Sequence, residues 1–186
     1  MKTVLHFKIF PLVLLIFLLK LPASLSMEGE TKTYHAGPLA FEAPVGYLKV
    51  EDLGPSPYAI SAYTISLAEE DPKIKNAWIT LIFKSKAQVS QLPPGTLLSH
   101  FKISLGASNP AEKQVTREIL KKKITGDWQH SKIPHPLTLE AYEITLSDGS
   151  TVFVAFRKLE SFSADKAEKF FNLFSMTLRE NTPKTK

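Results

Sequence analysis

The chain has 186 residues, 44% of them hydrophobic, no cysteine and a formal net charge of +5. The lack of cysteine excludes disulfides, catalytic thiols, thiolate metal ligands and lipid-modified cysteine anchors. Lys2, Lys8 and Lys20 supply much of the net charge, and without them it falls to about +2. The charge balance therefore does not indicate a nucleic acid or an anionic membrane as a partner.

Residues 1–26 have the order of a secretory signal peptide. A lysine-containing start precedes an apolar run at 9–19, and the small residues Ser24 and Ser26 stand before Met27. The run is shorter than the roughly 20 residues that span a bilayer. We therefore predict a cleaved signal, with a retained anchor as the alternative, and an exported protein that is periplasmic or secreted.

Removal of the signal leaves 160 residues, which suits one domain with its own core. The predicted organisation is a flexible mature N-terminus at 27–37, a single globular domain at 38–180 and a flexible tail at 181–186. Exported eukaryotic domains of this size usually carry disulfides. The chain has neither a cysteine nor an Asn-x-Ser/Thr glycosylation acceptor, so a bacterial origin is favoured.

Strand patterns dominate the first half of the domain. Residues 41–47 predict a strand that stops at Pro44 and turns at Gly46. Residues 58–67 alternate between apolar and small or polar side chains, as in a half-buried strand. Residues 77–84 are β-branched, aromatic and apolar on both faces, which predicts a strand that is covered on both sides.

Two helices are predicted in the middle of the chain. Residues 97–105 have apolar side chains at helical spacing and stop at Gly106. A second helix is predicted to begin at Asn109, with Pro110 in its first turn and residues 121–123 at its end. Its basic side is either simply exposed or docks an anionic surface, and consists of Lys113, Arg117, Lys121, Lys122 and Lys123.

The last third predicts strands at 124–132, 137–146 and 151–159, the first of them weakly. Asp148 and Gly149 supply a hairpin turn between the second and third. A final helix follows, capped by Ser163, whose inner side carries Ala167, Phe170, Phe171, Phe174 and Leu178. The order of elements predicts an α+β fold, a mainly antiparallel central sheet with helices packed on it.

The opening Phe41-x-x-Pro44-x-Gly46-Tyr47 resembles the aromatic-x-x-Pro-x-Gly-Trp opening of the PsbP-like family, which includes many exported bacterial proteins. The terminal hairpin and the phenylalanine-rich helix at 164–178 resemble that family too. The resemblance covers about 38–180, with Tyr47 where the family more often has Trp. It implies an α/β/α sandwich and a binding or assembly role, and it assigns no functional residue.

One polar cluster could carry chemistry. Asp127, His130 and His135 lie within nine residues and could supply an acid–base pair or Zn²⁺ ligands. The five-residue spacing of the histidines, with prolines on both sides of His135, does not match an HExxH arrangement. The alternative interpretation is a polar strand and loop. No serine-nucleophile elbow or phosphate-binding glycine loop is present.

We therefore predict an exported, non-catalytic binding or assembly-accessory domain that acts through a groove or face of the sheet. Its candidate contacts with a protein partner or small ligand are Trp128, expected to be half-exposed, His130 and His135. We assign no catalytic residue, metal or cofactor. One alternative is a small exported hydrolase or metal-dependent enzyme using Asp127, His130 and His135. A second is a structural envelope component, and the oligomeric state stays open.

Overall fold

The computed structural model describes residues 30–56, 59–68, 76–91, 93, 95–107, 111–131 and 135–181. A seven-stranded antiparallel sheet has the order β3-β4-β5-β9-β8-β7-β6. Its strands are β3 (Leu48–Asp52), β4 (Ser61–Leu67), β5 (Ala77–Lys84), β6 (Lys113–Ile119), β7 (Lys122–Ser131), β8 (Leu137–Thr145) and β9 (Thr151–Leu159). A three-stranded sheet has the order β1-β2-β10 and contains β1 (Thr31–Ala36), β2 (Leu39–Pro44) and β10 (Arg179–Glu180).

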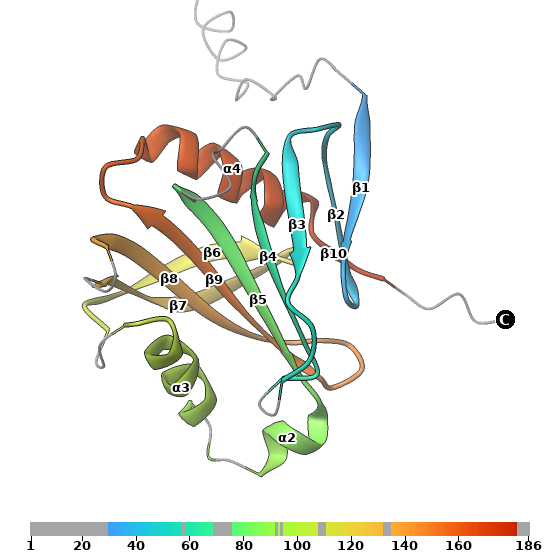
Figure 1. Cartoon of the computed structure of the whole chain (residues 1–186). Helices are drawn as coiled ribbons and strands as arrows, with labels where there is room; N and C mark the ends of the chain where they lie inside the picture. The colour runs from blue at the N-terminus through green and yellow to red at the C-terminus, as the bar shows by residue number, and fades with distance from the viewer. Residues whose placement is uncertain are drawn as a thin grey trace, which may run out of the picture.

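The large sheet is the middle layer of the molecule (Figure 1). Helix α4 (Ala164–Thr177) and the small sheet cover one face, which we call the α4 face. Helices α2 (Lys86–Ser90) and α3 (Thr96–Ser104) lie on the other, which we call the α3 face. Each face has its own apolar cluster. The predicted α+β class, an antiparallel sheet with helices packed on it, is confirmed.

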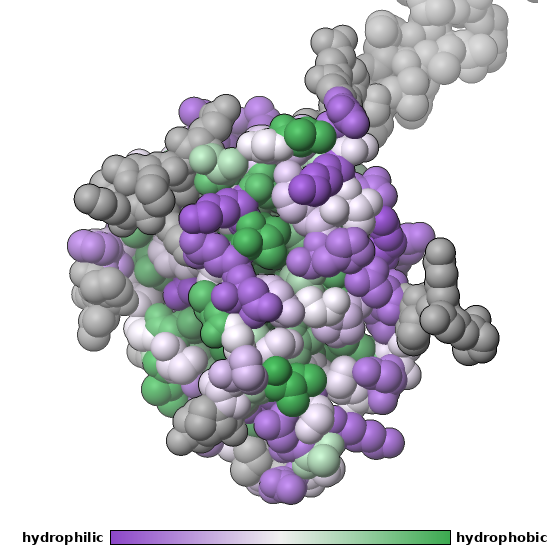
Figure 2. All heavy atoms as spheres, turned by 45° about the vertical axis from the view of Figure 1, so that its right-hand side comes forward, coloured by the Kyte–Doolittle hydropathy of each residue, from purple (hydrophilic) through white to green (hydrophobic). Residues whose placement is uncertain are grey.

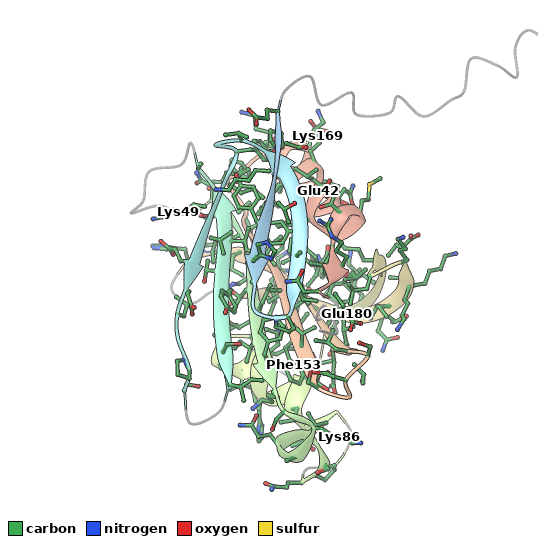
Figure 3. All side chains as sticks on the ribbon, turned by 90° about the vertical axis from the view of Figure 1, so that its right-hand side faces the viewer. Glu42, Lys49, Lys86, Phe153, Lys169 and Glu180 are labelled. Carbon is green, nitrogen blue, oxygen red and sulfur yellow. The ribbon has the colours of Figure 1, made fainter. Side chains whose placement is uncertain are left out.

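Central strand β5 is buried on both faces, as its sequence predicted. Ile79 and Leu81 belong to the cluster on the α4 face, whereas Ile82 packs against the cluster on the α3 face. Phe153 of the neighbouring strand β9 is fully buried and lies 5.4 Å from Phe101 of α3, ring centre to ring centre. Figure 3 shows Phe153 inside the molecule and Lys86 pointing outward from α2.

Helix α4 is built as the sequence predicted. The Ser163 hydroxyl accepts a hydrogen bond from the Lys166 N–H at 3.4 Å, which satisfies one donor of the first turn. Phe170 and Phe174 are fully buried against the large sheet and the small sheet. Lys169 lies on the exposed side of the helix, where it pairs with Asp165 at 2.9 Å (Figure 3).

The family-like opening forms a strand and a tight turn. β2 ends at Pro44, whose carbonyl accepts from the Tyr47 N–H at 3.1 Å, and Gly46 adopts a φ of 75°, which suits glycine. Tyr47 folds back on the core as a partly buried side chain. These residues therefore act as turn and packing features.

The helix predicted to begin at Asn109 is wrong, because the described residues 113–131 form the β6–β7 hairpin. Val115 and Ile119 fit a helical stripe, but they also fit a strand of period two with Arg117 between them. Leu120 and Lys121 make the turn with φ values of 53° and 59°. That conformation favours glycine, so neither Leu120 nor Lys121 marks a turn in the sequence.

A second difference concerns the N-terminus, where 27–37 was expected to be flexible. Residues 31–36 form β1, which pairs with β2 over its whole length. Tyr34 stacks on Phe41 at a ring-centre distance of 5.7 Å, and Ala36 is fully buried. The packing of these few side chains on β2 outweighs the polar composition of the segment.

The surface of the described residues carries only scattered large apolar side chains. The exposed ones are Val45, Leu53, Ile60, Ile103 and Met176. On the face shown in Figure 2, hydrophobic residues lie in separate patches among hydrophilic ones. None of the helices in the described ranges has both the length and the apolar character that crossing a bilayer requires. The predicted signal peptide lies outside the described residues.

Candidate functional site

Strand β7 directs its candidate residues to opposite faces of the sheet. Alternate side chains of a strand point to opposite faces. Trp128 pairs with Glu140 and lies on the α4 face with His130, two positions on. Asp127 lies on the α3 face, where its carboxylate binds the ammonium group of Lys102 in α3. The structure thus brings Trp128 and His130 together and separates Asp127 from both.

Trp128 is half-buried near the edge of the sheet and is held by two neighbours. The Lys113 Nζ atom lies 4.1 Å from the centre of the indole ring, in a cation–π contact across the β6–β7 pair. The His130 ring meets the indole edge-on, with ring centres 4.6 Å apart. We call Glu112, Lys113, Trp128 and His130 the Trp128 surface.

Glu112 holds His130 in place at the Trp128 surface through hydrogen bonds. Its carboxylate accepts the His130 backbone N–H at 2.7 Å and lies 2.9 Å from the ring Nδ1. Glu160, beyond β9, lies 3.8 Å from Nε2 on the other side of the ring. The His130 backbone bond, and then its ring contact, lower the pKa of Glu112. The contact therefore favours the folded state above the ordinary carboxyl pKa and is lost as the pH falls through the lowered value.

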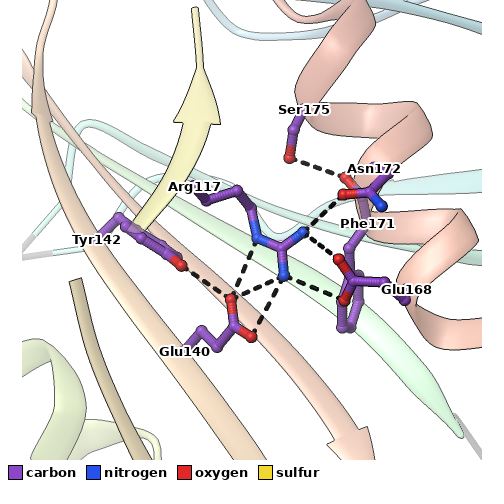
Figure 4. Close-up of polar contacts among 7 residues, drawn as sticks. All are labelled: Arg117, Glu140, Tyr142, Glu168, Phe171, Asn172 and Ser175. Atoms are coloured by element: carbon purple, nitrogen blue, oxygen red, sulfur yellow. Dashed lines mark hydrogen bonds and ion pairs between the residues drawn. The ribbon is translucent and has the colours of Figure 1, made fainter. Parts of the chain in front are cut away.

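Arg117 joins the edge strand β6 to helix α4 (Figure 4). Its Nη2 donates to Glu140 of β8 at 3.0 Å, and its Nη1 donates to Glu168 and Asn172 of α4, each at 2.9 Å. Burial alone would lower the pKa of Arg117, but the hydrogen bonds and charges of Glu168 and Glu140 raise it. The Arg117 side chain is permanently charged, and its ion pairs and hydrogen bonds link the sheet to helix α4.

Two aromatic side chains also contact this Arg117–Glu140 pair. The Arg117 guanidinium carbon lies 4.9 Å from the ring centre of Phe156. The Tyr142 hydroxyl donates to Glu140 at 2.8 Å (Figure 4). Burial, and then the Glu140 charge, raise the pKa of Tyr142. Since Glu140 pairs directly with Trp128, this network fixes the strand beside the Trp128 surface. Sequence reasoning missed it because Arg117 was assigned to a helix.

The enzyme alternative placed Asp127, His130 and His135 together, and the structure does not support this arrangement. Asp127 is engaged by Lys102 on the α3 face, whereas His130 is engaged by Glu112 on the α4 face. His135 is exposed, between β7 and β8. Within the described ranges, no three His, Asp or Glu side chains are grouped to hold a metal ion.

We expect the purified protein to hold well under one zinc ion per chain, because a stable zinc site needs three or four converging ligands. The His130→Ala, His135→Ala double variant should melt within a few degrees of the wild type. Elemental analysis and thermal unfolding check both results. Stoichiometric zinc that survives dialysis and disappears in the double variant would contradict this prediction.

No family model and no curated protein sequence matches the chain. Three similar solved structures are a Bacteroides thetaiotaomicron protein, LpqN and Mog1p. The first has a TM-score of 0.46 and 9% identity, covering 86% of this chain and 51% of that one, so this chain spans about half its length. LpqN, involved in cell envelope biogenesis of Mycobacterium tuberculosis, has a TM-score of 0.45 and 14% identity over 83% and 91% of the two chains.

Mog1p, a Ran-binding protein of Saccharomyces cerevisiae, has a TM-score of 0.45 and 11% identity over 84% of this chain and 97% of that one. At these values the likeness concerns chain architecture and carries no argument about function. The resemblance to the PsbP-like family stays a hypothesis.

Proposed function

We propose that this chain is an exported, non-catalytic binding domain that holds a protein partner at the Trp128 surface. The observation that carries the proposal is the half-buried indole of Trp128, fixed by Lys113 and His130. A large aromatic side chain with a restrained geometry loses little conformational entropy on binding. Tryptophan is also among the residues that contribute most to interface affinity.

The charges around Trp128 favour a partner segment that combines an acidic and an apolar side chain. The Glu112 carboxylate already accepts the His130 backbone N–H and lies against the His130 ring nitrogen, so its oxygens are engaged within the chain. Lys113 forms no ion pair with any described carboxylate, and its ammonium group stays exposed above the ring. An incoming carboxylate would meet this ammonium group while an apolar side chain covers the indole.

Site-specific photo-crosslinking in the producing cell tests the proposal. A photoreactive amino acid in place of Glu160, which is exposed 3.8 Å from the His130 ring and is not part of the Trp128 surface, should form a crosslink to a discrete protein, and Trp128→Ala in the same chain should abolish it. The matched control places the photoreactive group at Lys49, which is exposed on β3 at the opposite edge of the sheet (Figure 3). Identical crosslinks from both positions, or crosslinks that survive Trp128→Ala, would contradict the proposal. Absence of any crosslink would favour a purely structural envelope component.

Export is the second part of the proposal, and it depends on the signal peptide at residues 1–26. Cleavage after Ser26 should give a mature chain that starts close to Met27. Intact-mass spectrometry of the protein from the culture medium or the periplasm measures this start. A full-length chain that stays in the membrane fraction would show that the segment is an anchor instead.

A further inference from the structure

The α3 face carries a polar row that the proposed function does not use. Residues paired directly across neighbouring strands point to the same face. Trp78 of β5 pairs with Arg157 of β9, which pairs with Leu139 of β8, which pairs with Gln129 of β7. With strands about 4.8 Å apart, the backbones of Arg157 and Gln129 lie roughly 10 Å apart on either side of Leu139.

Polar atoms in this row are buried and have no partner among the described residues. Gln129 is fully buried, and neither its side-chain oxygen nor its side-chain nitrogen makes a hydrogen bond. The Nε of Arg157 is also buried without a partner. An unsatisfied buried polar group destabilises the folded state, so native proteins pair nearly all of them. Three unpaired atoms in one row therefore require an explanation.

Arg157 also has no ionic partner among the described residues. Its guanidinium lies 4.7 Å from the centre of the Trp78 ring, and its Nη2 donates to the Thr80 hydroxyl at 2.5 Å. Both contacts are with neutral groups, and no described carboxylate forms an ion pair with it. Burial lowers the pKa of Arg157 to about 10, so the side chain stays positive at neutral pH. By contrast, Lys102 on the same face is neutralised by Asp127.

Helix α3 covers this row at the Gln129 end. Asp127 and Ser131 flank Gln129 on the same face of β7. Lys102 binds the Asp127 carboxylate, and the Ser131 hydroxyl donates to the carbonyl oxygen of Gly106 at 2.7 Å. The end of α3 is thus attached to the residues on both sides of Gln129. A ligand that reaches this amide would be enclosed between α3 and the sheet.

We propose that the α3 face binds a small carboxylate with a second hydrogen-bonding group a few carbons away. The carboxylate would take the fork of Arg157, because guanidinium and carboxylate match in plane and spacing. The second group would pair with the Gln129 amide, which offers one acceptor and two donors. Leu139, which is itself fully buried, lies between them in the row, and the Trp78 ring packs against the Arg157 guanidinium.

Glutaramate is the probe for this site, because it has a carboxylate at one end and an amide at the other. Added to the purified wild-type protein at millimolar concentrations, it should raise Tm saturably and give a measurable Kd by calorimetry. Glutaramide has the same length without the charge, and inorganic phosphate has charge without the planar carboxylate. Neither should produce the shift.

Two variants locate the binding. Arg157→Lys keeps the charge but removes the fork, and should raise Kd at least about tenfold. Gln129→Leu removes the buried amide, so the free protein should be at least as stable as the wild type while glutaramate loses most of its effect. Trp128→Ala, on the opposite face, should bind glutaramate like the wild type, so this inference and the proposed function can fail separately.

Absence of a saturable shift would overturn the inference and would mean that the chain itself or solvent satisfies the row. An equal response to glutaramide or phosphate would overturn it too. Binding that persists unchanged in Gln129→Leu would place the probe elsewhere. If Arg157→Lys fails to fold, the Gln129→Leu result still decides.

Discussion

Phe174→Ala should lower the free energy of unfolding by about 3–5 kcal/mol, the loss usual for a fully buried phenylalanine. Phe174 has no exposed surface, and its ring centre lies 5.1 Å from that of Phe41 and 6.0 Å from that of Phe156. It thus joins α4, the small sheet and the large sheet at one point. Truncation would leave a cavity that three separate elements would have to close together. Urea unfolding followed by circular dichroism measures the loss.

Met176→Ala is the matched control on the same helix. Met176 is 75% exposed, and substitutions at such positions usually change stability by less than about 0.5 kcal/mol. A loss below about 1 kcal/mol for Phe174→Ala would mean that α4 is peripheral to the core.

Arg117→Leu should cost roughly 3 kcal/mol, near the lower end of the range for breaking a buried ion pair, because Glu140 keeps some solvent access. The side chain of Arg117 is 10% exposed and that of Glu140 19% exposed. Removal of the guanidinium leaves the Glu140 carboxylate with the Tyr142 hydroxyl but without its positive partner. Much of the cost is therefore the charge left behind rather than the pair itself.

A second substitution separates the two contributions. Arg117→Leu combined with Glu140→Gln removes the stranded charge but keeps an acceptor for Tyr142, so the double variant should be more stable than Arg117→Leu alone. Glu168→Gln should cost less than about 1 kcal/mol, because Glu168 is 53% exposed. Equal stability of Arg117→Leu and the double variant would show that Glu140 gains enough water to replace its partner.

Where local and tertiary signals agree, the sequence predicted the structure well. Residues 77–84 are apolar on both sides, and β5 occupies these positions in the middle of the large sheet. The apolar stripe after Ser163 became α4, and the turn at Asp148 and Gly149 joins β8 to β9. In each case a capping or turn residue stood where the hydrophobic period changed.

The β6–β7 hairpin shows why the remainder could not be predicted. Val115 and Ile119 suit both a helix and a strand, and a cap-like sequence before them favoured the helix. What decides is the pairing of β7 with β8, a long-range contact that no local window contains. Glycine at position 126 allows the two strands to approach this closely, because a Cβ there would lie 2.5 Å from the Ala141 carbonyl oxygen and from the Tyr142 ring.

At the candidate site, too, local features could be predicted from the sequence and tertiary contacts could not. Half-exposure of Trp128 was predicted from its polar neighbours, and the structure agrees. The partners Lys113 and Glu112 were not predicted, because they reach Trp128 and His130 only through the hairpin. The row of Arg157 and Gln129 depends on strand order and register, which one sequence does not reveal.

The turn at Leu120 and Lys121 has a consequence for the time course of folding. Both residues take a left-handed backbone conformation, which costs about 1–2 kcal/mol per residue without glycine. The Leu120 side chain repays part of this only after it packs on the assembled core. The β8–β9 hairpin has a favourable Gly149 at its turn and can form first. We therefore expect the sheet to grow outward from β8 and β9, with amide protection of β6 appearing last and its hydrogens exchanging first in the native protein.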